Sequence, residues 1–169
     1  MGQSFTVWLH LLAITVWIGP QFFMFVAAIP AMREIGDRQL RAHVIRIVVT
    51  RFGYMAWAAL VVIVFTGISN IFQTTDDYPY FFDYDYRYAQ VFSAKMTVLG
   101  ITVLLTAVHT FIVGPQQMRL AEDPEPDETK AAGLRRTSMI ISSLALLGSI
   151  IVLFFGALLS NHEWSFQAT

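Results

Sequence analysis

The chain has 169 residues, of which 56% are apolar and only 14% are charged, with a net charge of −1 and no cysteine. Soluble domains carry about 45–50% apolar and about 25% charged residues, so this composition excludes a disordered chain and an ordinary soluble enzyme and predicts a membrane protein. The near-zero charge excludes a nucleic-acid binder held by bulk positive charge, and the lack of cysteine excludes disulfide scaffolds and thiolate metal sites.

Four runs without charged residues predict four membrane-spanning helices. A bilayer core about 30 Å thick needs about 20 apolar helical residues to cross it. The uncharged runs reach this length, and we expect helices at about residues 5–30, 52–72, 94–113 and 138–160. The predicted fold is an all-α integral membrane protein, an antiparallel four-helix transmembrane bundle that forms a single transmembrane domain over residues 1–169.

The basic residues predict the orientation of the bundle. The first and third loops hold nine of the eleven Lys and Arg residues, namely Arg33, Arg38, Arg41, Arg46, Arg51, Arg119, Lys130, Arg135 and Arg136. Loops rich in Lys and Arg stay in the cytoplasm, so both of these loops are expected inside and both termini outside. We expect an integral protein of a bacterial inner membrane, with the lipid bilayer as its first partner and no nucleic acid bound.

Three connecting segments differ in character. Residues 36–50 carry apolar side chains at helical spacing and predict a cytoplasmic amphipathic segment, either an interfacial helix or an extension of the second span. Residues 74–90 are rich in Tyr and Asp and predict an aromatic belt at the outer interface, with an acidic partner surface or a cation site as the alternative. Residues 121–130 are acidic and interrupted by proline, which predicts a flexible cytoplasmic linker. No strong internal repeat is apparent.

Two helices carry polar residues at heptad spacing. The first has His10, Trp17 and Met24 on one face, and the third has Lys95, Thr102 and His109. Ionisable groups are costly inside a membrane, so these faces are expected to point into the bundle, although Lys95 can also extend toward the outer surface. The fourth helix has a stripe of small residues from Ser138 to Ser160, which close helix packing explains without any chemistry.

The four histidines are the candidate ligands. His10 and His109 lie inside spans but at different depths, whereas His162 is closer in depth to His10 and His43 to His109. Two pairs at two depths are typical of a transmembrane di-haem cytochrome, while a structural hydrogen bond or a proton relay remains open for each intramembrane histidine. We therefore take His10, His109 and Trp17 as candidate cofactor-binding residues, and His10, His109 and His162 as candidate metal ligands.

Three segments carry a family resemblance. They are HLLAITVWIGPQFFMFVAAIPAMR (His10–Arg33), RFGYMAWAALVVIVFTGI (Arg51–Ile68) and AKMTVLGITVLLTAVHTFIVGPQQMRL (Ala94–Leu120). In this order they resemble the first three helices of the CopD-like membrane proteins and of the related HemJ-type protoporphyrinogen oxidases. The HemJ branch implies b-type haem with His10 as its ligand and Lys95 as a functional lysine. The CopD proteins proper imply copper uptake or resistance, whereas the Gly-Pro that follows His109 looks more like the uncharacterised CopD-like branch.

Three functions remain open from the sequence. The first is a membrane protein that binds b-type haem through an intramembrane histidine and acts in redox chemistry or electron transfer. The second is a copper-handling protein that uses His10 and His162, and the third is a non-catalytic accessory subunit of a larger membrane complex with no cofactor. Lys95 is the one candidate for a catalytic residue, and enzymatic activity is left open. The small-residue stripe and the Tyr-rich loop predict a homo-oligomer or a larger membrane complex.

Overall fold

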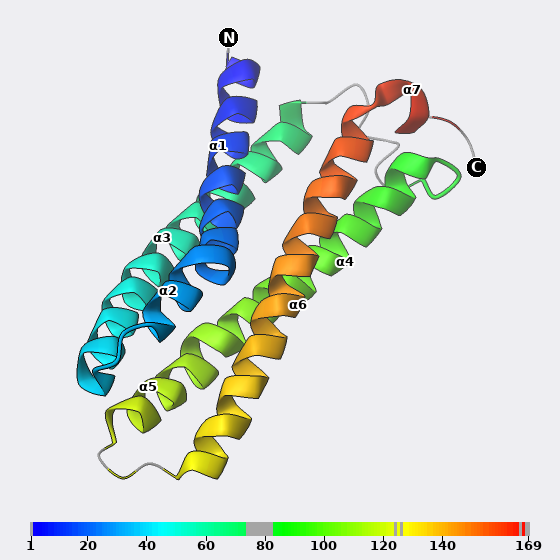
Figure 1. Cartoon of the computed structure of the whole chain (residues 1–169). Helices are drawn as coiled ribbons and strands as arrows, with labels where there is room; N and C mark the ends of the chain where they lie inside the picture. The colour runs from blue at the N-terminus through cyan, green and yellow to red at the C-terminus, as the bar shows by residue number, and fades with distance from the viewer. Residues whose placement is uncertain (1, 74–82, 124, 126, 166, 168–169) are drawn as a thin grey trace.

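A computed structural model describes residues 2–73, 83–123, 125, 127–165 and 167 (Figure 1), and these residues form helices and no strand. Within them, four helical segments are long and apolar enough to cross a membrane: Gly2–Arg33, Arg38–Phe72, Arg87–Glu122 and Glu128–Ser160. The all-helical class and the number of candidate spans predicted from the uncharged runs are therefore confirmed.

The first and third candidate spans are each divided by a π-helical turn. The first comprises α1 (Gly2–Phe23), the π-helix η1 (Met24–Ala28) and α2 (Ile29–Arg33), and the third comprises α4 (Arg87–Val108), the π-helix η3 (His109–Val113) and α5 (Gly114–Glu122). Pro30 and Pro115 lie two residues after the ends of these turns. Because proline has no N–H to donate to the carbonyl four residues earlier, the preceding turn widens to a π-helix.

The second and fourth helices are uninterrupted. α3 runs from Arg38 to Gln73, so the amphipathic segment 36–50 continues directly into the second span. α6 runs from Glu128 to Ser160 and is followed by the short helix α7 (His162–Ser165). The Asp127 carboxylate caps α6 by accepting hydrogen bonds from the backbone N–H groups of Thr129 and Lys130, at 3.0 and 3.1 Å, so α6 begins within the expected linker. Both bonds lower the pKa of the Asp127 carboxyl from its ordinary value, and the bond from Lys130 has the larger effect.

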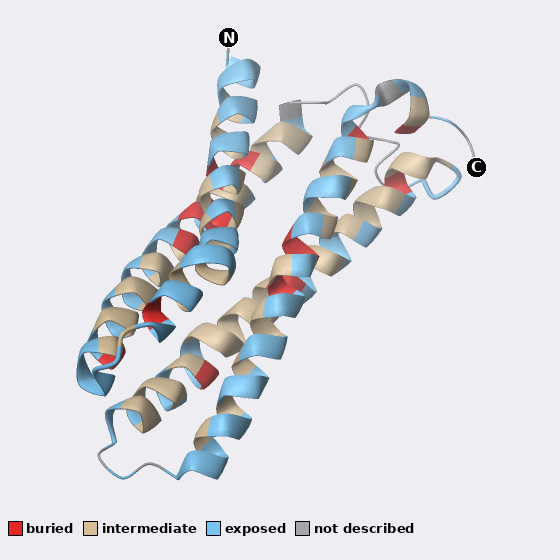
Figure 2. Ribbon diagram, in the orientation of Figure 1, coloured by how far each residue is buried: buried red, intermediate tan, exposed pale blue. Residues whose placement is uncertain are grey.

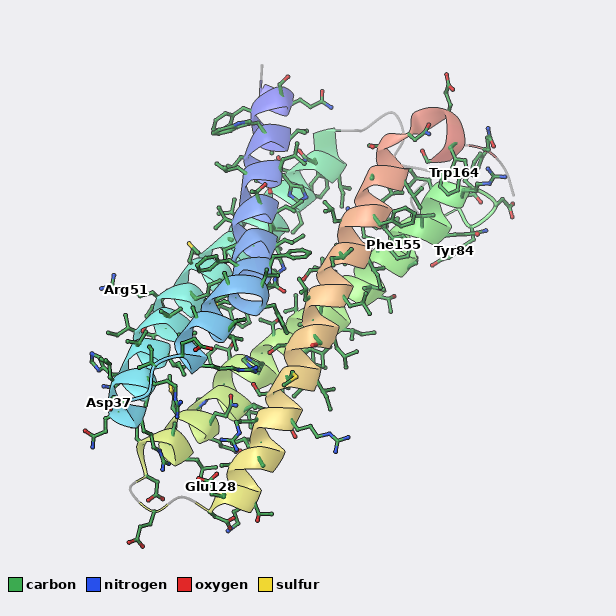
Figure 3. All side chains as sticks on the ribbon, in the orientation of Figure 1. Asp37, Arg51, Tyr84, Glu128, Phe155 and Trp164 are labelled. Atoms are coloured by element: carbon green, nitrogen blue, oxygen red, sulfur yellow. The ribbon has the colours of Figure 1, made fainter. Side chains whose placement is uncertain are left out.

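The helices are arranged as two pairs, α1 with α3 and α4 with α6 (Figure 1). The two pairs meet where α6 approaches α1 and where α5 approaches α3. Both termini lie at one end of the structure, which we call the terminal end, and the connections after α2 and α5 lie at the opposite loop end. Tyr84 and Trp164 are found at the terminal end, and Asp37 and Glu128 at the loop end (Figure 3).

Few side chains are buried, and large apolar side chains cover the surface (Figure 2). Trp17 is 5% exposed and packs with Ala56, Ala59 and Leu60 to form the core of the first pair. By contrast, Phe65 is 70% exposed. An apolar surface this extensive is unfavourable in water but matches the hydrocarbon of a bilayer, which agrees with the membrane assignment.

The two pairs are structural repeats of one another. α1 and α4 both have 22 residues, both lead into a π-helix of five residues, and both continue through a proline, so residues 85 positions apart correspond. In α3 and α6, residues 89 positions apart correspond, because buried residues recur at this spacing. The pairs are Ala56 and Ala145, Ala59 and Gly148, and Leu60 and Ser149. The sequence carries a partial trace of this repeat that we did not recognise from it: Phe65 and Phe154, and Gly67 and Gly156, are identical pairs, whereas His10 and Lys95 differ in chemistry.

Candidate functional site

His10 is held by a hydroxyl on the neighbouring helix. Its Nδ1 lies 2.7 Å from Thr66 Oγ1 on α3, and Thr66 itself donates to the carbonyl of Val62 at 2.6 Å. Because a hydroxyl has a single proton, Thr66 must accept a hydrogen bond from His10 Nδ1. The Nδ1 atom therefore carries the imidazole proton, and Nε2 keeps its lone pair. In this tautomer the Nε2 lone pair can bind a metal ion or accept a proton.

Lys95 packs against the helix next to it in its own pair. The Lys95 Nζ atom is 3.6 Å from the position that a Cβ atom on Gly156 would take, so it rests against the bare backbone of α6. No described residue gives its ammonium a hydrogen bond or an ion pair. Gly67 lies beside the ring in the same manner, since a Cβ there would be 3.4 Å from His10 Cε1.

These contacts define a polar region with one part in each helix pair, His10 in the first and Lys95 in the second. We call it the His10–Lys95 site, formed by His10 of α1, Thr66 and Gly67 of α3, Lys95 of α4, and Gly156 of α6. The sequence indicated His10 and Lys95 from their position inside apolar runs. It assigned no role at this site to Thr66 or Gly67, and it placed Gly156 only in the small-residue stripe of the fourth helix. A threonine followed by glycine within an apolar helix is a signal that could have identified the hydroxyl.

Trp17 lies one heptad farther along α1, and its polar atom is already engaged. The Trp17 Nε1–H donates to Ser149 Oγ at 3.1 Å, and the Ser149 hydroxyl donates to the carbonyl of Ala145 at 2.9 Å. Ser149 is 3% exposed and Thr102 is 2% exposed. This layer joins α1 to α6 and lies between the His10–Lys95 site and the loop end. The small-residue stripe of α6 is thus in contact with the other helices of the same chain.

His109 does not approach His10. It begins the π-helix η3, and its Nε2 forms a 2.9 Å hydrogen bond with Ser138 Oγ on α6. His109 follows Lys95 by 14 residues, which corresponds to about 21 Å along a helix. The two histidines therefore cannot ligate one metal ion together.

The remaining histidines give no metal cluster. His43 lies exposed on α3 near the loop end, and His162 begins α7, although its side chain lies outside the described part of the structure. In the described ranges, no group of three or more His, Asp or Glu side chains could hold a metal ion. Of the candidate ligands, His10 has the best-defined surroundings.

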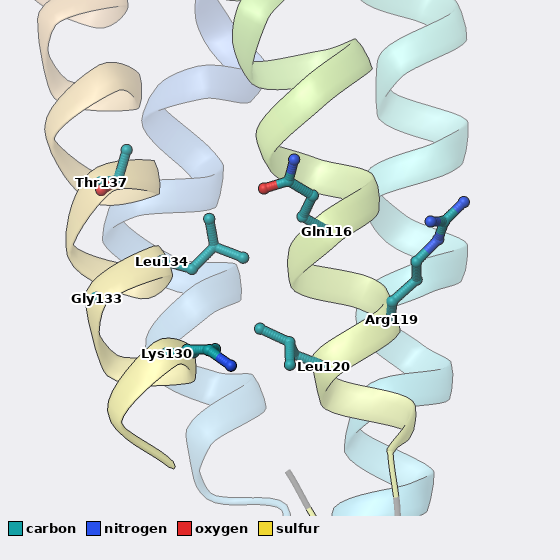
Figure 4. Close-up of a pocket in the computed structure, with 7 residues that line it drawn as sticks. All are labelled: Gln116, Arg119, Leu120, Lys130, Gly133, Leu134 and Thr137. Carbon is teal, nitrogen blue, oxygen red and sulfur yellow. The ribbon is translucent and has the colours of Figure 1, made fainter. Parts of the chain in front are cut away.

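An open hollow of about 560 Å³ lies between α5 and α6 at the loop end (Figure 4). Its lining is Gln116, Arg119, Leu120, Lys130, Gly133, Leu134 and Thr137. It contains neither a histidine nor a carboxylate, and it lies at the opposite end of the helices from the His10–Lys95 site. We assign it no metal-binding role.

Comparison with known proteins gives one match. The family described as copper resistance protein D, or CopD, matches residues 46–159, which is more than half of the chain. This range begins in α3 and ends in the last turn of α6, so it includes Thr66, Lys95 and His109 but not His10. No curated protein and no solved structure matches the chain. The predicted resemblance to the CopD-like proteins is confirmed, whereas the relation to the HemJ-type oxidases stays a prediction.

Proposed function

Since this chain belongs to the copper resistance protein D family, we propose that it is a membrane protein that handles copper as its substrate, with His10 as the residue that binds the ion. The observation that supports this role is the fixed tautomer of His10. Thr66 holds Nδ1 and orients the ring, which leaves the Nε2 lone pair for a metal ion. A second partner that fixes the tautomer is the usual arrangement of a metal-binding imidazole.

Copper suits this donor set better than harder cations do. Imidazole is a good ligand for copper, while magnesium and calcium prefer carboxylate and carbonyl oxygens. Every described Asp and Glu side chain is exposed, so no carboxylate among them reaches the His10–Lys95 site. His10 then supplies one nitrogen ligand. A low number of protein ligands is consistent with a copper ion that is bound only transiently.

A b-type haem is supported less well. The family match is to copper resistance proteins, and His10 and His109 are too far apart to ligate one iron from both faces. Trp17, the third candidate cofactor residue, uses its only donor on Ser149. His162 stays a candidate second ligand for copper, as the sequence suggested. A non-catalytic accessory role is the remaining alternative and predicts no bound metal.

The test is copper binding by the purified full-length chain in mild detergent. Cu(I) is titrated against a chromophoric chelator for the wild type, His10→Ala, and the control His43→Ala, in which an exposed histidine is removed. Loss of an outer partner of a metal ligand costs about 10–100-fold in affinity, so loss of the ligand itself should cost at least as much. We expect this loss in His10→Ala and wild-type affinity in His43→Ala. A chain that binds no Cu(I), or a Soret band that disappears in His10→Ala, would contradict the copper assignment.

We also propose the membrane topology predicted from the sequence, an antiparallel bundle with both termini outside. The nine basic residues of the first and third loops support it. So does the presence of Tyr84 and Trp164 at the terminal end (Figure 3), because such aromatic residues favour the membrane interface. The chain has no cysteine, so a single Glu125→Cys or Asp85→Cys variant reports on one loop. An impermeant thiol reagent added to intact cells should label Asp85→Cys only, and labelling of Glu125→Cys would overturn the orientation.

Association with a second copy or with a larger membrane complex is a further part of this proposal. The small-residue stripe of α6 supports it less than the sequence suggested, because Ser138 and Ser149 bond to His109 and Trp17 within the chain. Most of the Tyr-rich loop lies outside the described residues. The mass of the particle in mild detergent tests association, and a monomer would argue against it.

A further inference from the structure

The hollow at the loop end lies where the apolar surface of the helices ends. On the α5 side its lining begins at Gln116, one turn after Ile112, whose side chain is 53% exposed. On α6 its lining ends at Thr137, and Met139 and Ile140 just beyond it are exposed. Exposed apolar side chains of a membrane helix face the lipid hydrocarbon, and the polar side chains beyond them face the headgroups. The hollow is therefore at the depth of the lipid headgroups.

The lining of the hollow combines positive charge with apolar side chains. Arg119 of α5 and Lys130 of α6 contribute two cations, and no carboxylate of the described residues lines it. Leu120 and Leu134 are half-buried, and each points toward the opposite helix (Figure 4). A basic pocket between membrane helices at the membrane surface is an arrangement that binds anionic lipid headgroups.

Both cations are available to a bound anion. Arg119 is exposed and forms no ion pair within the described residues, and its flexible side chain, which extends toward α3 in Figure 4, can rotate onto a ligand. Lys130 forms an ion pair of 3.2 Å with Asp127, and the two side chains are 77% and 45% exposed. An ion pair this exposed holds its partners only weakly. The carboxylates of Glu122 and Glu128 are already paired with other arginines.

Gly133 keeps the α6 side of the hollow open. A Cβ atom at this position would meet no heavy atom within 4 Å, whereas one at Gly148 on the same helix would collide with Thr102. The hollow measures about 560 Å³, which is within the range of about 300–1,000 Å³ that small-molecule sites occupy. A headgroup therefore has room beside the backbone of α6, and a large side chain at position 133 would take that room.

We propose that the loop-end hollow binds an anionic phospholipid. The two cations neutralise the headgroup, the Gln116 amide and the Thr137 hydroxyl are hydrogen-bond donors for its oxygens, and the two leucines contact the acyl chains near the headgroup. A lipid fits this site better than free phosphate does, because its acyl chains use the apolar surface beside the hollow. In the topology proposed above, the hollow opens to the cytoplasmic leaflet, where anionic lipids are found. The inference does not depend on the copper function.

The first test removes the charges. Native mass spectrometry of the full-length chain in mild detergent gives its affinities for phosphatidylglycerol, which is anionic, and for phosphatidylcholine with identical acyl chains. One Lys or Arg near the membrane surface contributes about fivefold in affinity for an anionic lipid, so two contribute roughly 25-fold. The double variant Arg119→Gln/Lys130→Gln should lose phosphatidylglycerol binding by this factor and keep its phosphatidylcholine binding. The control Arg33→Gln/Arg51→Gln removes two exposed arginines that do not line the hollow, and it should bind both lipids as the wild type does.

The second test fills the hollow and leaves both charges in place. Gly133→Phe should reduce the affinity for phosphatidylglycerol to that for phosphatidylcholine. Gly53→Phe is the matched control, because a Cβ atom on Gly53 of α3 also meets no heavy atom within 4 Å, and this variant should keep the wild-type preference. Circular dichroism checks that each variant is folded, and Gly133→Leu replaces Gly133→Phe if the larger side chain prevents folding.

Three results would overturn the proposal. Equal losses in the two double variants would show that the lipid responds to the charge of the whole surface and not to the hollow. Phosphatidylglycerol binding that persists in Gly133→Phe would place the lipid elsewhere on the protein. Glycerol phosphate, the water-soluble headgroup, that competes as strongly as the lipid itself would show a site for free phosphates and not for a phospholipid.

Discussion

Gly148 provides a sharp test of how closely α4 and α6 approach each other. A Cβ atom at this position would collide with Thr102 Oγ1, and it would lie 3.4 Å from Thr102 Cβ. Thr102 is 2% exposed, and its hydroxyl donates to the carbonyl of Val98 at 2.8 Å. Turning the Thr102 hydroxyl away from the new methyl group would disturb its hydrogen bond to Val98, and a β-branched side chain in a helix has few other rotamers. The substitution Gly148→Ala therefore strains the contact between α4 and α6.

The size of the effect follows from two opposing terms. Overpacking a tight contact costs about 1–3 kcal/mol. Replacing glycine by alanine within a helix gains about 1 kcal/mol from helix propensity. Gly100→Ala is the matched control, because Gly100 lies in α4 with nothing within 4 Å of its would-be Cβ. Both variants gain the propensity term, so the difference between them measures the steric term, and we expect Gly148→Ala to be less stable than Gly100→Ala by about 1–3 kcal/mol.

Reversible unfolding by SDS in mixed micelles, followed by tryptophan fluorescence, gives the free energies. A double-mutant cycle with Thr102→Ala should recover most of the loss, because that change removes the atom in collision. Equal unfolding free energies for Gly148→Ala and Gly100→Ala would refute the close approach of α4 and α6. An additive cycle would show that the loss arises elsewhere than at Thr102.

Two further predictions concern the middle layer and the start of α6. Ser149→Ala leaves the buried Trp17 N–H without an acceptor and should cost about 1–3 kcal/mol by the same unfolding assay, whereas Ser160→Ala, which changes an exposed serine, should cost less. The Asp127 carboxyl should titrate below its ordinary pKa in an NMR titration. Because its folded pKa is lowered, the cap stabilises the protein above the unfolded pKa and its contribution is lost as the pH falls through the folded value. Asp127→Asn should remove this pH dependence, and an Asp127 carboxyl that titrates at its ordinary pKa would contradict the capping geometry.

The membrane-spanning helices could be predicted from the sequence because they depend on runs of neighbouring residues and not on contacts between distant ones. Runs of uncharged residues identify the four long helices, and the cost of charge in a bilayer correctly drew attention to His10 and Lys95. The helix ends could not be predicted as well, since α3 and α6 continue into charged segments where hydropathy gives no signal. Asp127 is a recognisable N-cap residue, yet it lies in a segment whose prolines favour a linker.

The contacts at the site required the structure. Heptad spacing places Lys95, Thr102 and His109 on one face of a helix, but it does not say which neighbouring helix each residue meets. Thr66 becomes the partner of His10 only through the packing of α1 on α3. The repeat is hard to recognise from the sequence because its most distinctive residues differ between the halves, as in His10 with Lys95 and Trp17 with Thr102. The pairs that match, such as Phe65 with Phe154, are residues common in any membrane helix.

The duplicated architecture has a consequence for how such a site can evolve. Two identical helix pairs assembled about a twofold axis must carry the same residue at both equivalent positions, either two histidines or two lysines. A single chain that contains both pairs is free of this restriction, because a substitution in one half leaves the other unchanged. The two halves of this chain can therefore carry an imidazole at one position and an ammonium group at its equivalent, as they do with His10 and Lys95.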